Sequence, residues 1–88
     1  MRMNKEKIIQ TQMPIIGTNI KRLREERNLK NVDVVRKLQI EGCTISAPIL
    51  TKIETGINNP SVEILIALAE LFDCSFDEFF QPIESEHK

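Results

Sequence analysis

The polar side chains that this sequence offers for binding gather between Thr44 and Ser61. The segment carries several hydroxyl groups, the two amides of Asn58 and Asn59, and the cation Lys52. None of these groups is a strong general acid or base near neutral pH. They are instead donors and acceptors that suit anionic oxygens and polar base edges. The segment therefore indicates binding chemistry.

Catalytic groups are scarce elsewhere. The only histidine, His87, lies in a polar tail, no glycine-rich phosphate loop is present, and neither Cys43 nor Cys74 has a base nearby in sequence. Catalysis requires positioned acids, bases or nucleophiles, so we expect no enzyme. The cysteines lack metal-ligand spacing, so we expect free thiols, with Cys43 exposed in a turn, and neither a metal nor a cofactor.

The segment also predicts two helices joined by a turn. Ser46 suits an N-cap, Pro48 falls in the first turn of the helix, and Gly56 ends that helix in a left-handed cap. A second helix is expected over 31–39, just upstream. Two short helices joined by a turn form a helix-turn-helix, which presents its second helix to a DNA groove. We therefore expect helix 47–55, the recognition helix, to read the major groove of double-stranded DNA.

Helical patterning continues on both sides of this unit. A stripe begins at Ile16 with i, i+4, i+7 spacing, and residues 62–72 form an apolar helix. Ser75 followed by Glu78 predicts a capping box that opens a fifth helix. The sequence thus predicts an all-α, compact five-helix bundle. We divide it into an N-terminal arm (1–14), a helix-turn-helix domain (15–80) and a flexible tail (81–88).

Charge is distributed unevenly along the chain, although the net charge is only −1. Residues 15–56 carry eight Lys or Arg and five Asp or Glu, whereas residues 57–88 carry one and seven. A basic front and an acidic back orient a molecule near a polyanion. No apolar run approaches the ~18 residues of a membrane span, and no signal peptide is visible. We expect a cytoplasmic, nucleoid-associated protein with no membrane partner and no small-molecule ligand.

The chain resembles the phage-repressor-like helix-turn-helix family, the group of lambda repressor, Cro and the Xre regulators, over about residues 15–80. The residues that carry the resemblance are 20–24 with Leu29, then Lys37 and Leu38, then 53–56, then Pro60 and Ser61, and finally 75–79. The resemblance implies a lambda-repressor-like bundle of five helices that binds operator DNA, commonly as a homodimer.

The resemblance also implies roles for particular residues. Arg24 and Glu54 correspond to an ion pair between the first and third helices, and Asn31 corresponds to a phosphate contact at the start of the second helix. Lys21 and Arg22 are further candidates for phosphate contacts, the alternative being solvated charges. We predict DNA contacts from the start of the second helix, from the recognition helix and from the turns before and after it. These residues are Asn31, Thr44, Ser46, Ala47, Pro48, Thr51, Lys52, Asn58 and Asn59.

Three departures from the family's pattern concern the recognition helix. Gln39 stands where the family often has glycine, and Val35 replaces a small residue. About five extra residues, 41–45, separate the second and third helices, and Gly42 is a candidate for the left-handed position. We expect a different angle or spacing of the recognition helix, within the same fold.

The helix over 62–72 is more apolar than one buried face requires. We therefore predict a homodimer contact formed by Ile64, Leu71 and Phe80, since exposed apolar patches often mark interfaces. In the alternative, residues 1–14 or the tail cover these side chains in a monomer.

Two functions follow from these observations. The first is a sequence-specific transcriptional regulator of the repressor type that binds double-stranded operator DNA. The alternative is a protein-binding helix-turn-helix adaptor, antirepressor or antitoxin, which the apolar start of the recognition helix and the negative total charge favour.

Overall fold

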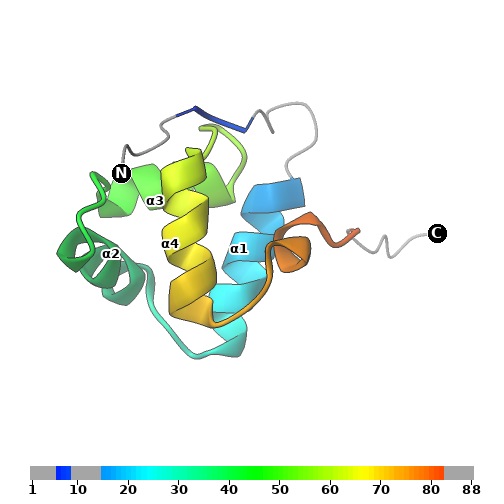
Figure 1. Ribbon diagram of the computed structural model, residues 1–88, viewed down its shortest axis with the longest axis horizontal. Helices are drawn as coiled ribbons and strands as arrows, with labels where there is room; N and C mark the ends of the chain where they lie inside the picture. Colours follow the sequence, from blue (N-terminus) through cyan, green and yellow to red (C-terminus); the bar gives the residue numbers. More distant parts are fainter. Residues whose placement is uncertain (1–5, 9–14, 83–88) are drawn as a thin grey trace.

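The computed structural model describes residues 6–8 and 15–82. These residues form four α-helices followed by one 3-10 helix (Figure 1). The elements are α1 (Ile15–Glu26), α2 (Asn31–Ile40), α3 (Ala47–Glu54), α4 (Val62–Phe72) and η1 (Phe76–Phe80). The described part of the chain has no strand, only an isolated antiparallel bridge between Lys7 and Ser61. The all-helical prediction is confirmed, whereas the count of five helices is not confirmed, because the fifth element is a 3-10 helix.

The fifth element is a 3-10 helix, and the predicted capping box does not form. The Ser75 side chain makes no capping hydrogen bond. Glu78 Oε1 instead lies 3.2 Å from Arg22 Nη2, which also donates to the Glu78 backbone oxygen at 3.1 Å. The Glu78 carboxylate thus pairs with Arg22 of α1, and η1 is a single short 3-10 helix.

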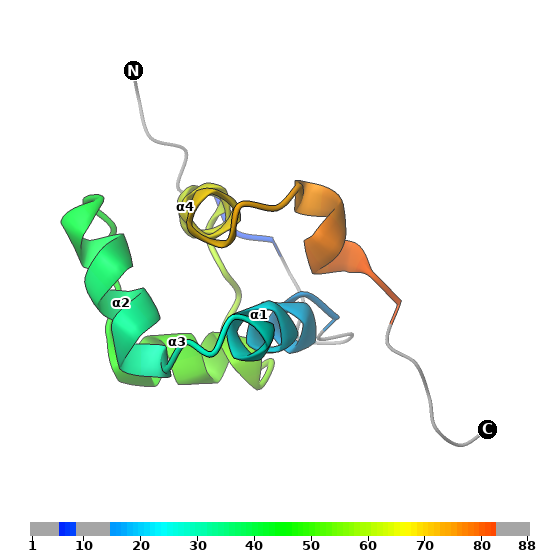
Figure 2. The same ribbon diagram turned by 90° about the horizontal axis from the view of Figure 1, so that it is seen from below.

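The helices surround one core. α3 packs against α1 and α2, α4 packs against α2 and η1, and η1 covers α1. Figure 2 shows α4 end-on, with α2 on one side of it and η1 on the other. The largest fully buried side chains come from every helix and from the loop before α4: Ile20, Leu23, Val34, Leu38, Leu50, Ile53, Pro60, Leu68, Phe72 and Phe79. Leu50 and Ile53 thereby fix the inner face of α3.

A residue in the left-handed conformation follows the last turn of each α-helix. These residues are Asn28 (φ 56°), Gly42 (φ 97°), Gly56 (φ 87°) and Asp73 (φ 54°). Backbone hydrogen bonds close each of these turns; at α3, for example, Ile57 N donates to Lys52 O at 2.8 Å. The left-handed positions predicted for Gly42 and Gly56 are confirmed, because glycine has no Cβ to oppose a positive φ.

The inserted turn is fixed to the core. Cys43 is 7% exposed and Ile45 is 5% exposed, while Thr44 between them is exposed. Gln39 Nε2 donates to Ile45 O at 2.8 Å and holds the turn against α2. The expectation of an exposed Cys43 is wrong, because alternate side chains of this extended stretch point to opposite sides.

The described part of the N-terminal arm runs beside the start of α4. Ile8 N donates to Pro60 O at 2.9 Å, and Val62 N donates to Glu6 O at 2.8 Å. Ile8 is half-buried against the core. The remaining residues of the predicted arm, and residues 83–88 of the predicted tail, lie outside the described residues.

The prediction that Ile64 takes part in a dimer contact is wrong. Ile64 is 8% exposed and belongs to the core. It lies one helical turn before Leu68, on the buried face of α4. A side chain in this position has no free surface for a second copy.

Candidate nucleic-acid interface

α3 exposes one continuous face. Pro48, Thr51, Lys52 and Thr55 are exposed, and their i, i+3, i+4, i+7 spacing places them on one side of the helix. Ser46 caps the helix, its Oγ accepting from Ile49 N at 3.4 Å. The outer face of α3 is therefore open, with a single cation at its middle.

The only carboxylate of α3 is held on the inner side by α1. Arg24 Nε lies 2.8 Å from Glu54 Oε2, and Arg24 Nη2 lies 3.0 Å from Glu54 Oε1. The two side chains are 13% and 5% exposed. This hydrogen bonding to Glu54 raises the pKa of Arg24 further above its ordinary value, against the opposing effect of burial. The structure thus contains the ion pair that the resemblance implies, and the outer face of α3 is left without a carboxylate of its own.

Arg24 also connects α3 to the loop before α2. Its Nη1 donates to Leu29 O at 2.9 Å. One guanidinium therefore joins α1, the α1–α2 loop and α3, and a bidentate pair fixes orientation as well as distance.

Asn31 connects the start of α2 to α3. Its Nδ2 donates to Ala47 O at 3.2 Å and to Thr51 Oγ1 at 3.1 Å. Its Oδ1 is buried and has no hydrogen-bond partner among the described residues. Asn31 positions the first turns of α3, and its contact with a phosphate stays a prediction.

The other predicted contacts lie beside α3 in a groove. Thr44, Asn58 and Asn59 line this groove together with Ile49 on the flank of α3. The amides at the start of α4 are partly occupied, since Val62 N donates to Glu6 O and Ile64 N donates to Ser61 Oγ at 3.1 Å. These two backbone N–H groups are therefore not available to a phosphate at the start of α4.

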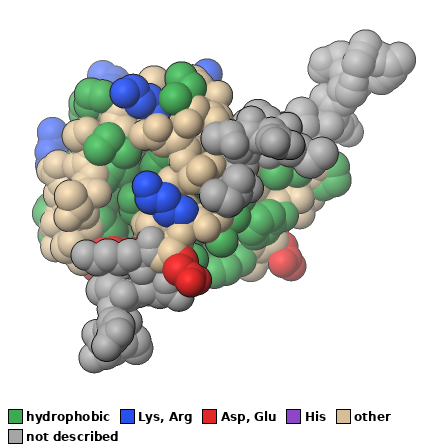
Figure 3. Space-filling model, turned by 90° about the horizontal axis from the view of Figure 1, so that it is seen from above, with side chains coloured by type: hydrophobic (Ala, Val, Ile, Leu, Met, Phe, Trp, Pro, Cys, Tyr) green, Lys and Arg blue, Asp and Glu red, His purple; other side chains and the backbone are tan. Residues whose placement is uncertain are grey.

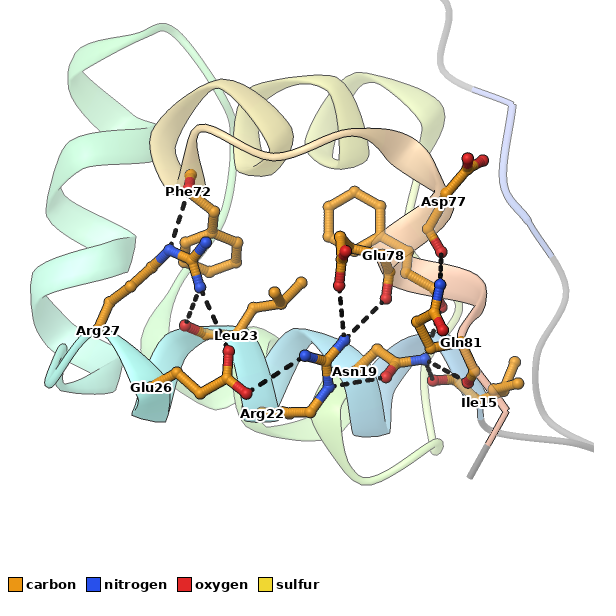
Figure 4. Close-up of polar contacts among 11 residues, drawn as sticks. Ile15, Asn19, Arg22, Leu23, Glu26, Arg27, Phe72, Asp77, Glu78 and Gln81 are labelled. Atoms are coloured by element: carbon orange, nitrogen blue, oxygen red, sulfur yellow. Dashed lines mark hydrogen bonds and ion pairs between the residues drawn. The ribbon is translucent and has the colours of Figure 1, made fainter. Parts of the chain in front are cut away.

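Arg22 holds the carboxyl-terminal segment to α1 (Figure 4). Its guanidinium contacts Glu26 at 3.3 Å and Glu78 at 3.2 Å. Asn19 reinforces this contact, with Nδ2 donating to Phe79 O at 3.0 Å and to Gln81 O at 2.9 Å. The sequence analysis did not predict this role of Asn19. Its position three residues after Ile16, beside the apolar stripe of α1, could have indicated a buried polar side chain that needs hydrogen-bond partners.

The face that carries α3 shows both kinds of charged side chain. Figure 3 views the molecule from the side that carries α3 and residues 6–8 in Figure 1, and the visible Lys and Arg side chains lie on its left half and upper edge. The Asp and Glu side chains that are visible lie along its lower edge. On the face in view, the basic and acidic side chains thus occupy separate areas.

Comparison with known proteins identifies the family. A helix-turn-helix family model, of the Xre and lambda-repressor type, matches residues 20–79, from α1 through most of η1. The chain belongs to this family. No curated protein and no solved structure gave a match. Helix-turn-helix proteins of this type are DNA-binding regulators, in which the two helices that correspond to α2 and α3 form the DNA-binding unit.

Residues 6–8 and 15–82 contain neither a membrane-spanning helix nor a cluster of metal ligands. No helix there has the length and apolar character required to cross a membrane. No group of three or more His, Cys, Asp or Glu side chains gathers there in a way that could hold a metal ion.

Proposed function

We propose that the protein is a sequence-specific transcriptional regulator of the repressor type that inserts α3 into the major groove of double-stranded operator DNA. The outer face of α3 carries this proposal. It presents Lys52 and no carboxylate, while Arg24 and Asn31 hold α3 rigidly from behind. Rigid positioning of the reading helix is what base readout requires, and phosphate contacts supply most of the affinity.

The alternative is an adaptor that binds a protein through the same side of the molecule. Ile49 and Ile57, on and just after α3, are 38% and 65% exposed and favour it. An adaptor would use these apolar side chains and would have no affinity for duplex DNA. A measurement of affinity for duplex DNA therefore distinguishes the two functions.

The test is binding to a random-sequence duplex of about one helical turn (~10 bp), which holds one domain. We expect affinity to fall steeply between low and moderate salt, with a slope set by the number of phosphate contacts. Lys52→Ala should weaken binding and reduce that slope by about 0.9, the loss of one counterion. Lys37→Ala is the matched control, since it removes the same charge from the groove between α2 and α4. Because the duplex holds one domain, dimerisation does not affect this comparison.

Absence of binding even at very low salt would leave the adaptor as the function. Equal losses for the two lysine variants would show that the affinity is a general charge effect that does not involve α3.

We further propose that the regulator acts as a homodimer on a two-fold operator, with half-sites about one DNA turn apart. Leu71 lines a groove between α2 and α4 together with Ile40, which is 77% exposed. Phe80 lies on η1, on the other side of α4 from α2 (Figure 2). Leu71 and Phe80 therefore do not share one surface. The groove that contains Ile40 and Leu71, which Lys37, Glu41 and Glu70 also line, is the better contact for a second copy.

A further inference from the structure

The outer face of α3 lacks the side chains that usually read bases. α3 contains no Arg, Asn or Gln, the residues that pair bidentately with guanine or adenine. Among the described residues, Lys52 is its only cation. Specific readout by this helix must therefore use other groups.

The two threonine hydroxyls on this face already have partners within the domain. Thr51 Oγ1 accepts from Asn31 Nδ2 at 3.1 Å. Thr55 Oγ1 donates to Thr51 O at 2.9 Å and approaches Lys52 O at 3.3 Å. These contacts use one lone pair of Thr51 Oγ1 and the proton of Thr55 Oγ1, so both hydroxyls keep part of their hydrogen-bonding capacity. The apolar groups of this face are the ring of Pro48 and the threonine methyl groups.

The major groove offers apolar groups of this kind one partner, the C5 methyl group of thymine. A methylated cytosine presents the same methyl group at the same ring position. Burying one such group contributes about 0.8 kcal/mol, which corresponds to about a fourfold change in Kd.

We propose that α3 reads pyrimidine C5 methyl groups through Pro48 and Thr51, with Lys52 supplying the adjacent charged contact. The proposal rests on the proposed function, since it requires α3 in the major groove. It agrees with the place of Pro48 in the first turn of α3, because helix-turn-helix proteins contact bases with the start of the recognition helix. Thr51 lies three residues further along the same face. Operators for this protein therefore contain thymine, or 5-methylcytosine, at defined positions of each half-site.

The first experiment removes single methyl groups from the DNA. The operator is selected from a random duplex pool and resynthesised with deoxyuridine in place of thymidine, one position at a time. We expect Kd to rise about fourfold at each contacted position and to stay constant at the others. Where cytosine replaces a contacted thymine, 5-methylcytosine should bind more tightly than cytosine.

The second experiment assigns the contact to α3. Pro48→Ala should reduce the preference for thymine over uracil toward unity at one position, because the ring that meets the methyl group is gone. Lys52→Ala should weaken the thymine and uracil duplexes by the same factor, so that their ratio is unchanged. This pattern separates methyl contact from a general effect of uracil on the duplex.

The outcomes distinguish the two proposals. If no duplex is selected or bound, the proposed function fails and takes this inference with it. If the selected duplex is bound but every single-uracil duplex binds equally well, methyl readout is wrong and DNA binding stands. A thymine preference that survives Pro48→Ala and Thr51→Ser would also overturn it.

Discussion

The Arg24–Glu54 pair makes a quantitative prediction about how α3 is held. Arg24→Met leaves Glu54, with a side chain that is 5% exposed, without its cation. Removing one partner of a buried ion pair costs about 3–5 kcal/mol, because the remaining charge stays desolvated. The variant also loses the hydrogen bond to Leu29 O, which contributes about 1 kcal/mol. We expect the free energy of unfolding to fall by about 4 kcal/mol or more.

Such a loss is large for this chain. Domains have roughly 0.05–0.15 kcal/mol of stability per residue, so 88 residues have about 4–13 kcal/mol in total. In domains of up to about 100 residues, each kcal/mol moves Tm by about 4–8 °C, so Tm should fall by roughly 15–30 °C. Urea unfolding followed by circular dichroism, together with a thermal scan, measures both quantities.

Two comparisons decide whether the stranded charge is the cause. Arg36→Met removes an exposed arginine that lies 3.9 Å from Asp33, and should cost under about 1 kcal/mol. The double variant Arg24→Met, Glu54→Leu removes both charges and should recover most of the lost stability. If it is no more stable than Arg24→Met, or if Arg36→Met costs as much, the reasoning about buried charge is refuted.

Two further predictions concern other parts of the molecule. Burial raises the pKa of the Cys43 thiol, and the carboxylate of Glu63 acts in the same direction. Since the thiolate is the reactive form, alkylation of Cys43 near pH 8, followed peptide by peptide, should be about tenfold or more slower in the folded protein than in urea. Equal alkylation rates in the two states would contradict the burial of Cys43. Because the folded thiol ionises at a higher pH than the unfolded one, its contribution to stability is complete below the ordinary thiol pKa and is lost as the pH rises above it. Ile40→Glu should shift the sedimenting species to the 10.1 kDa monomer, whereas Phe80→Glu, on the opposite side of α4, should leave the dimer intact; the reverse result would place the contact on η1.

Much of the fold followed from local patterns. The start and end of α3 were predicted from Ser46, Pro48 and Gly56, because capping and left-handed turns depend on a few neighbouring residues. The exposure of Thr51 and Lys52 followed from the spacing of the apolar residues Leu50 and Ile53. Periodicity of this kind fixes which face of a helix is apolar, and with it the face left for binding.

The sequence by itself thus determined the helices, their order, the family and the helix that faces outward. The tertiary structure decided which partner each side chain meets. Ile64 and Cys43 are covered, Glu78 pairs with Arg22 instead of capping η1, and the Thr51 hydroxyl accepts from Asn31. These outcomes depend on contacts between segments that are distant in the chain. They could not be predicted because helical periodicity indicates which face of a helix is apolar but not which segment packs against that face.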